Sequence, residues 1–308
     1  MGFLPFPCAA IEVGTNSLHL LIGEPDSEGG LRIREDLTLM TRLGKGLAPG
    51  GRLREEAVQR TITTLRRFAQ TCRTYQVEKL AVVGTHSLRV AINAEDFIRK
   101  VEEECGFRTG IVSSKEEARL SFLAIVRGYN VGEASLLVLD IGGGSTEIIY
   151  GKEGVIEEVV SLPVGAVGLT RQYLPSDPVR DEEWEGLLHH LRKQLLLLPK
   201  VHSSSLTFGV GGTITTLMAM ELGLREFTSH QVEQQRLTIH QLEEGIKRLK
   251  SLPIAERRER LALPPLRADI ILAGAAILYT ILERYRREDI MVSIRGVRYG
   301  LLHELLEG

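Results

Sequence analysis

Cysteine, net charge and long apolar runs are all scarce in this chain. The three cysteines, Cys8, Cys72 and Cys105, are widely separated and form no CxxC pair, which argues against a zinc site or a disulfide framework and fits a reducing compartment. No apolar run approaches the roughly 18 residues of a membrane helix, and the N-terminal segment lacks the basic region of a signal peptide. The sequence therefore predicts a cytoplasmic protein with no membrane partner.

The formal net charge of the 308 residues is only −2. This balance gives no general attraction to nucleic acid or to anionic lipid, so no nucleic-acid polymer is expected as a partner. A protein of this kind that binds phosphate must gather positive potential locally. With 43% apolar and 25% charged residues, the composition is typical of a soluble globular protein, and the length favours two lobes.

A short motif occurs twice along the chain. Residues 12–17 read EVGTNS and residues 140–145 read DIGGGS, so an acid, a β-branched residue, a glycine and a serine fall in register. Each copy stands between two strand-like segments, and the glycine-containing turn at 84–87 resembles the turn at 209–213. We interpret this repeat as two lobes of related topology. The alternative is a coincidence between two ordinary hairpins.

The spacing of apolar residues predicts an α/β protein. Residues 1–123 are expected to form the first lobe and residues 124–296 the second, followed by a last helix at about 297–308. The charge run at 256–260 is interpreted as a solvated helix face. The expected helices cover 55–74, 94–105, a segment from about 115, 184–198, 214–222, 242–249, 268–285 and 301–306, and the expected strands cover 8–13, 17–23, 31–40, 79–84, 110–113, 134–139, 147–151, 155–162 and 206–210.

The second copy of the motif carries the strongest indication of chemistry. In the turn formed by Gly142, Gly143 and Gly144, backbone amides can converge on a phosphate because no Cβ blocks the approach. Ser145 and Thr146 add hydroxyl donors directly after the turn. The structural alternative is a β-hairpin whose glycines only make the turn.

Acids stand beside both copies of the motif. Asp140 would repel a phosphate directly, but it can hold a hydrated Mg²⁺ or another divalent cation that meets the phosphate oxygens. Glu147 follows in the same hairpin and can orient water or complete the metal shell. Glu12 occupies the corresponding place in the first copy and is a further candidate metal ligand.

Other segments offer further anion-binding groups. Asn16 and Ser17 belong to the first copy of the motif, although Asn16 also suits a left-handed turn for purely structural reasons. Gly211, Gly212 and Thr213 lie between a strand and a helix, where a helix N-terminus favours negative charge. The alternative for this second group is a tight entry into the helix.

Two arginines and one glutamate complete the set of candidates. Arg89 and Arg298 could grip phosphate oxygens bidentately, although a solvated surface position is the commoner fate of an arginine. Glu117 has two interpretations. Ser114 and Glu117 fit a capping box, in which Glu117 reaches back to the first amide of the helix. Alternatively, Glu117 accepts a proton from an attacking water molecule.

Taken together, these segments resemble the exopolyphosphatase/guanosine pentaphosphate phosphohydrolase (Ppx/GppA) family of the actin-like ATPase superfamily. The resemblance runs through most of the chain and implies two actin-like (ribonuclease H-like) lobes around a central cleft, with the last helix, at about 297–308, returning to the first lobe. The specific combination is DIGGGSTE with KEEARL upstream. The segments that carry the resemblance are AIEVGTNSLHLLI, TRLGKGL, GTHSLRVAINA, SSKEEARLSF, VLDIGGGSTEII, SLPVGAVGLT, FGVGGTITTL, RADIILAGAAIL and SIRGVRYG.

The resemblance implies an enzyme that hydrolyses phosphoanhydrides with the help of Mg²⁺. Its substrate would be inorganic polyphosphate or pppGpp, the nucleotide of the stringent response. Glu117 then looks like the catalytic base, and Asp140 and Glu147 look like the metal- and water-positioning acids. The phosphate grip would comprise Arg89, Asn16, Ser17 and residues 142–146.

Three positions depart from the pattern that the family usually shows. Glu12 and His19 stand where the family usually has Asp and Arg, and Tyr299 stands where a Glu is common. The chain also resembles the short members, which lack the helical C-terminal extension that supports dimerisation and long-chain binding in longer ones. The sequence leaves a homodimer as an alternative to a monomer. It also leaves three alternative functions: an exopolyphosphatase, a pppGpp 5′-phosphohydrolase and a non-catalytic sensor of polyphosphate or (p)ppGpp.

Overall fold

The computed structural model describes residues 6–26, 30–196, 198–199, 201 and 205–307, and the chain divides into two compact units. Unit 1 comprises residues 1–128 and 295–308, and unit 2 comprises residues 129–294. The first division falls at Gly128 rather than at residue 123, because helix α4 (Ser114–Gly128) remains whole within unit 1.

Unit 1 is built on a five-stranded mixed sheet with the order β3-β2-β1-β4-β5. β1 pairs antiparallel with β2, which pairs antiparallel with β3, whereas β4 and β5 continue the sheet in parallel. This arrangement follows from the short turn between β1 and β2 and from the long helical connection before β4. The strands are β1 (Cys8–Val13), β2 (Ser17–Pro25), β3 (Leu31–Met40), β4 (Lys79–Gly84) and β5 (Thr109–Ile111).

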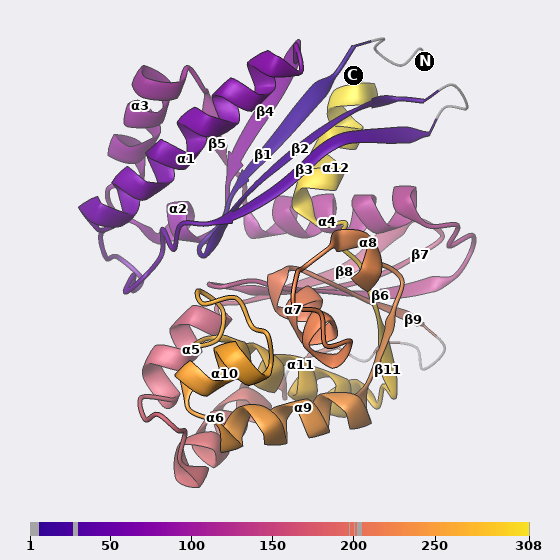
Figure 1. Cartoon of the computed structure of the whole chain (residues 1–308). Helices are drawn as coiled ribbons and strands as arrows, with labels where there is room; N and C mark the ends of the chain where they lie inside the picture. The colour runs from indigo at the N-terminus through magenta and orange to yellow at the C-terminus, as the bar shows by residue number, and fades with distance from the viewer. Residues whose placement is uncertain (1–5, 27–29, 197, 200, 202–204, 308) are drawn as a thin grey trace. The chain divides into compact units, whose positions relative to one another are not determined.

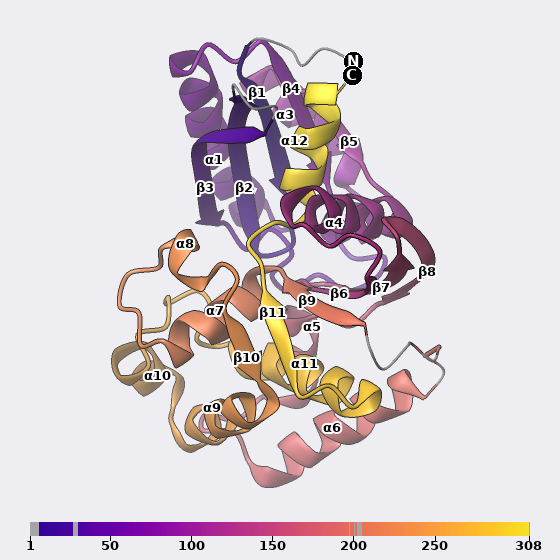
Figure 2. The ribbon, with the colours of Figure 1, turned by 90° about the vertical axis from the view of Figure 1, so that its right-hand side faces the viewer.

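Helices cover both faces of this sheet (Figure 1). Apolar side chains such as Ile11 and Leu20 pack against α1 (Glu55–Thr74) and α3 (Ala94–Cys105) in one core, and the short α2 (His86–Val90) follows β4. α4 and α12 (Val297–Glu307) lie on the opposite face, as Figure 2 shows from the side. A Cβ on Gly300 would lie 2.1 Å from the carbonyl oxygen of Leu120, so only glycine permits this close contact between the two helices.

Unit 2 is built on a six-stranded sheet with the order β10-β11-β9-β6-β7-β8. β6, β7 and β8 form an antiparallel meander, while β9 and β11 pair in parallel beyond β6. The strands are β6 (Ser135–Ile141), β7 (Thr146–Lys152), β8 (Val155–Leu162), β9 (Leu206–Val210), β10 (Arg236–Thr238) and β11 (Asp289–Val292).

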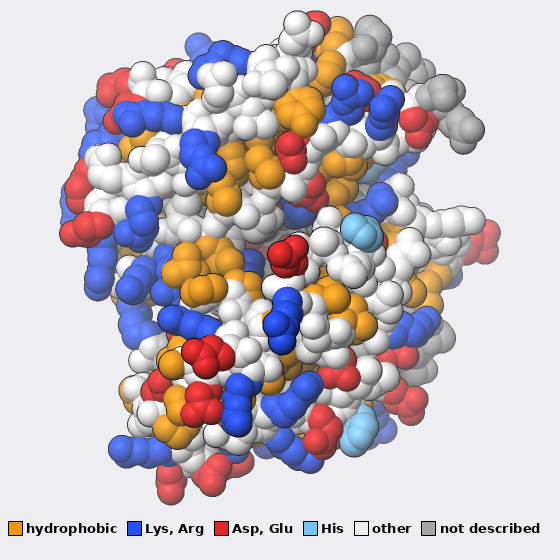
Figure 3. Space-filling view, viewed as in Figure 1, with side chains coloured by type: hydrophobic (Ala, Val, Ile, Leu, Met, Phe, Trp, Pro, Cys, Tyr) orange, Lys and Arg blue, Asp and Glu red, His pale blue; other side chains and the backbone are white. Residues whose placement is uncertain are grey.

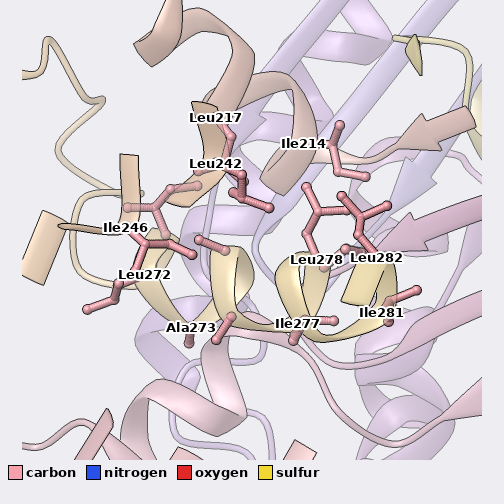
Figure 4. Packing of buried hydrophobic residues seen from close by; sticks show 14 of the residues in the cluster. Ile214, Leu217, Leu242, Ile246, Leu272, Ala273, Ile277, Leu278, Ile281 and Leu282 are labelled. Atoms are coloured by element: carbon pink, nitrogen blue, oxygen red, sulfur yellow. The ribbon is translucent and has the colours of Figure 1, made fainter. Parts of the chain in front are cut away.

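One apolar helix, α11 (Ile271–Tyr285), lies at the centre of unit 2 and contacts four other helices. Because α11 is buried nearly all round, its sequence is apolar on every face rather than on one stripe. Figure 4 shows Leu278 and Leu282 of this helix near Ile214, and Leu272 near Ile246, with Ile277 on the opposite side of the helix. The other helices are α5 (Ala166–Tyr173), α6 (Asp181–Leu195), α7 (Gly212–Glu221), α8 (Ser229–Val232), α9 (Ile239–Ser251) and α10 (Ile254–Arg260).

The sheet topology confirms the internal repeat. In both units the first strand pairs antiparallel with the second and parallel with the fourth, and the second pairs antiparallel with the third. The cross-strand registers agree as well, since Glu12 lies opposite His19 and Asp140 lies opposite Glu147. His19 of unit 1 therefore takes the place of Glu147 in unit 2.

The charge run at 256–260 is not wholly a solvated face, and this expectation was wrong for Arg257. That side chain is 1% exposed, and it donates hydrogen bonds to the carbonyl oxygens of Leu249, Leu252 and Ala268. Burial lowers the pKa of Arg257 below its ordinary value. Arg257 thus ties three backbone segments together from the inside.

Charged side chains of both signs mix over the face shown in Figure 3, in keeping with the small net charge. Within the described part of the chain, no helix is both long and apolar enough to cross a membrane.

Candidate active site

The first glycine turn joins β1 to β2 and is fixed by backbone hydrogen bonds. Gly14 N–H donates to the Ser17 carbonyl oxygen at 3.0 Å and closes the turn. The Asn16 carbonyl oxygen accepts hydrogen bonds from the amides of Thr41 and Arg42 at 3.1 and 2.9 Å. The backbone of the turn is therefore held by the end of β3 and the loop after it, so its side chains are not needed to fix the turn.

The side chain of Asn16 is the clearest open group in this turn. It is only 6% exposed, yet neither its Oδ1 nor its Nδ2 has a hydrogen-bond partner among the residues that the structure describes. The buried hydroxyl of Ser87, in α2, is likewise unpartnered within that part of the chain. A buried polar group without a partner is costly, so these atoms are suited to a polar ligand.

Arg89 and Glu117 form an ion pair within unit 1. Arg89 Nη1 donates to Glu117 Oε2 at 2.5 Å and to the Val112 carbonyl oxygen at 3.0 Å. Arg89 Nη2 is buried and has no partner among the described residues. Arg89 thus holds a mostly buried carboxylate with one nitrogen and keeps a second nitrogen for an anion.

The helix cap differs from the expected capping box. Ser113, not Ser114, receives the amide hydrogen bond at the start of α4, from Glu116 N–H at 3.2 Å. Glu116 then pairs with Arg119 in the next turn. Glu117 is therefore directed at Arg89 rather than serving as the capping-box glutamate of Ser114.

A buried charge cluster lies on the sheet face beneath α12. Arg298 donates to both carboxylate oxygens of Asp36 at 3.0 and 3.1 Å, and Tyr299 Oη donates to Asp36 Oδ2 at 3.0 Å. Burial opposes the charge of Arg298, but Asp36, Tyr299 and Glu12 outweigh it and raise the pKa of Arg298. His19 Nδ1 and Thr38 Oγ1 are 2.9 Å apart on the neighbouring strands.

The second glycine turn, between β6 and β7, repeats the geometry of the first. Gly142 N–H donates to the Ser145 carbonyl oxygen at 3.0 Å. The turn is also held by α5, because the amides of Ala166 and Val167 donate to the carbonyl oxygens of Gly142 and Gly143 at 3.2 and 2.9 Å. The Gly142 amide and the carbonyl oxygens of Gly142 and Gly143 are thus used within the protein, and the amides of Gly143, Gly144 and Ser145 are the ones suited to a ligand.

Thr146 has a different role from the predicted one. Its hydroxyl is fully buried and donates to the Val164 carbonyl oxygen at 2.8 Å. Thr146 therefore fixes the segment that leads into α5 and does not offer its proton to a phosphate. Ser145, the other predicted hydroxyl, lies 3.4 Å from Glu147 Oε2.

The two acids of unit 2 face each other across β6 and β7. Asp140 pairs in register with Glu147, and Ser161 Oγ orients Glu147 by donating to its Oε1 at 2.9 Å. Among the described residues, no three His, Cys, Asp or Glu side chains come together as a complete metal site. Two carboxylates fit Mg²⁺, which usually takes one or two carboxylates and fills its remaining positions with water and substrate oxygens.

Gly211–Thr213 begin α7 directly beside this pair of acids. A Cβ on Gly211 would lie 2.9 Å from Asp140 Oδ1, and Gly211 has a positive φ of 90°. The guanidinium of Arg267 lies over Gly212, where an added Cβ would come within 2.1 Å of Arg267 Nη2. Burial lowers the pKa of Arg267 to about 10, so the group stays cationic near neutral pH.

Arg267 is a residue of this site that the sequence does not indicate. The residue lies in the segment RADIILAGAAIL, but no local spacing marks it as a partner of a turn more than fifty residues upstream. Only the packing of α11 against α7 reveals the contact.

These features define an α/β protein of two repeated units, each with an acid and a glycine turn suited to phosphate. Sequence comparison narrows this class. The model of the Ppx/GppA phosphatase family matches residues 26–308, and the chain belongs to that family. Its two actin-like lobes are those that the sequence predicts.

Among curated relatives, exopolyphosphatase 2 of Mycobacterium tuberculosis is 31% identical over 97% of this chain and 96% of its own length. The bifunctional 3-dehydroquinate synthase/phosphatase of Fusobacterium nucleatum is 28% identical over 97% of this chain but only 46% of its own, so the chain spans about half of that relative.

Solved structures of the same family are similar to this one. A Ppx/GppA family member from Aquifex aeolicus is 33% identical, with a TM-score of 0.83 over 98% of both chains. An exopolyphosphatase from Cytophaga hutchinsonii is 24% identical, with a TM-score of 0.88 over 98% of both chains, and shows the same fold.

Proposed function

We propose that this protein is a phosphohydrolase that releases terminal phosphate from inorganic polyphosphate by the attack of water on a phosphoanhydride bond. The observation that carries the proposal is the pair formed by Glu117 and Arg89. A mostly buried carboxylate and a guanidinium with one nitrogen left over are the groups that a water-activating base and a phosphate grip require.

Glu117 acts in this proposal as the base that takes the proton of the attacking water. Arg89 orients Glu117 with Nη1 and binds a phosphate oxygen with Nη2. The unpartnered amide of Asn16 binds further phosphate oxygens from the first turn. Because phosphoryl transfer needs little covalent chemistry from the protein, positioning and charge stabilisation supply most of the rate.

The acids of unit 2 are proposed to hold the divalent cation. Asp140 and Glu147 would bind Mg²⁺, which offsets negative charge on the phosphates when bound. The amides of residues 143–145 and the cationic Arg267 add anion-binding groups in the same unit. Removal of divalent cations with a chelator is therefore expected to abolish turnover and leave the fold intact.

Replacement of Glu117 tests the central role. Glu117→Gln is expected to fold as the wild type does and to lose at least roughly a hundredfold in kcat, the range of a general base. The matched control is Glu116→Gln, which removes the same charge one residue earlier from a side chain that pairs with Arg119 instead. Phosphate release by Glu117→Gln at the wild-type rate would remove Glu117 from the mechanism.

The substrate is decided by one side-by-side assay. Phosphate release is measured from long-chain polyphosphate and from pppGpp, each with and without Mg²⁺. Faster release from polyphosphate supports the proposal, whereas release from pppGpp alone shows a nucleotide phosphohydrolase. Tight binding of either compound without release shows a sensor.

A further inference from the structure

Arg298, at the start of α12, comes from the far end of the chain and lies under the sheet of unit 1. It is 9% exposed, and its bidentate bonds to Asp36 fix the guanidinium plane. Tyr299 also donates to Asp36, and the guanidinium lies 5.1 Å from the centroid of the Tyr299 ring. A side chain with this many contacts has one orientation.

The negative charge of Glu12 also raises the pKa of Arg298, by less than that of Asp36. Glu12 on β1 lies opposite His19 on β2, and His19 lies opposite Thr38 on β3, two residues from Asp36. Because side chains alternate along a strand, these residues share the sheet face that α12 covers. Glu12 and Asp36 thus lie on the same sheet face as the Arg298 guanidinium, which is bound to Asp36.

The other side of Glu12 faces the first glycine turn. Glu12 Oε1 lies 3.8 Å from the position that a Cβ on Gly14 would take. A carboxylate at this place repels any phosphate that enters the turn, and the repulsion is strong because the surroundings are buried. A turn that binds phosphate therefore needs a positive charge to offset Glu12.

We infer that Arg298 is a positioning residue for the first phosphate turn: its charge offsets that of the Glu12 carboxylate so that the Gly14–Ser17 turn can accept an anion. This inference rests on the proposed function for the statement that the turn holds phosphate. It gives the last helix of the chain a role in ligand binding, which Arg298 exerts through Glu12 and without contact to the ligand.

Two charge-removing substitutions test the inference. Arg298→Met keeps the apolar stem and removes the charge, and it is expected to weaken binding of inorganic tripolyphosphate at least about tenfold, as measured by calorimetry in metal-free buffer. Adding Glu12→Gln to this variant removes the repulsion as well. The double variant is expected to regain most of the lost affinity, which a purely structural role of Arg298 does not predict.

Leu302→Ala is the matched control for a loosened helix. Leu302 is buried in α12 and packs against Gly23, so its truncation lowers the melting temperature without touching the charge cluster. Its affinity for tripolyphosphate is expected to equal that of the wild type. Circular dichroism establishes that every variant compared is folded at the assay temperature.

The outcomes separate this inference from the proposed function. The inference is overturned if Leu302→Ala weakens binding as much as Arg298→Met, if adding Glu12→Gln to Arg298→Met restores no affinity, or if the wild type does not bind tripolyphosphate. A wild type that binds tripolyphosphate and shows the rescue, but releases no phosphate from any substrate, supports the inference and refutes the proposed function.

Discussion

At the scale of single residues, His303 shows how burial couples the fold to pH. This side chain of α12 is mostly buried, and its Nε2 has no hydrogen-bond partner among the described residues. Burial, together with the charges of Arg127 and Arg295, lowers the pKa of His303 from 6.5 to about 4. His86 in α2 has a similarly lowered pKa of about 4, caused by burial and by Arg89.

A lowered histidine pKa means that the unfolded state binds the proton first as pH falls. The contribution of neutral His303 to the unfolding free energy is therefore complete above pH 6.5, and it is lost as the pH falls from 6.5 toward 4. The wild type loses unfolding free energy between pH 7.5 and pH 5.0, and in His303→Leu this loss is expected to be smaller by about 1–2 kcal/mol. The measurement is urea unfolding by circular dichroism at both pH values, and the exposed His189→Leu is the control. An unchanged pH dependence in His303→Leu would show that His303 titrates normally.

The residue scale also shows what local sequence can and cannot predict. The SKEE pattern correctly places the start of α4, yet the side chain that caps the helix is Ser113. The choice between two adjacent serines depends on the path of the chain before the helix, which no spacing rule contains. The departures at Glu12 and Tyr299 look unrelated in sequence, but both side chains act on Arg298.

At the scale of elements, the long strands and helices follow from the periodicity of apolar residues. α1 and α3 lie where the sequence predicts them, because each buries one regular face, and β2 and β3 also lie at their predicted places. The missed elements are short or irregular: α2, α5, α8, β10 and β11. β11 has four residues and depends on pairing with β9 through Met291 and Phe208, a contact far apart in sequence.

The close contact between the start of α5 and the second glycine turn can be tested by substitution. A Cβ on Gly165 would come 2.4 Å from Gly144 N and 2.5 Å from the carbonyl of Gly143, so Gly165→Ala must displace the turn itself. We expect this variant to bind tripolyphosphate at least about tenfold more weakly, because the turn amides lose their alignment. Titration calorimetry measures the loss.

Gly168→Ala is the control for Gly165→Ala within the same helix. A Cβ on Gly168 meets nothing within 4 Å, and alanine favours helix more than glycine does by about 1 kcal/mol. Gly168→Ala is therefore expected to leave phosphate binding unchanged and to stabilise α5 slightly. Equal behaviour of the two variants would mean that the turn does not depend on the backbone of α5.

At the scale of the whole molecule, the two units differ in how the chain builds them. Unit 2 is one continuous segment with its own apolar core around α11. Unit 1 needs a second segment, because α12 covers β1 and β2 and packs against α4. Arg295 lies against Gly128, so the two ends of unit 1 that flank the second unit are close to each other. The repeat predicts two similar folds, but it does not predict this difference in continuity.

This difference predicts how fragments of the protein behave. Residues 129–294 alone are expected to fold, with Trp184, the single tryptophan, buried as in the full chain. Residues 1–128 alone are expected not to fold cooperatively, since the sheet face beneath α12 would be exposed. Joining Gly128 to Arg295 through a short Gly/Ser linker should restore a cooperative thermal transition, because it returns α12 while omitting unit 2. Tryptophan fluorescence reports on residues 129–294, which contain Trp184, and circular dichroism reports on residues 1–128. A cooperative thermal transition in residues 1–128 without α12 would contradict the role given to that helix.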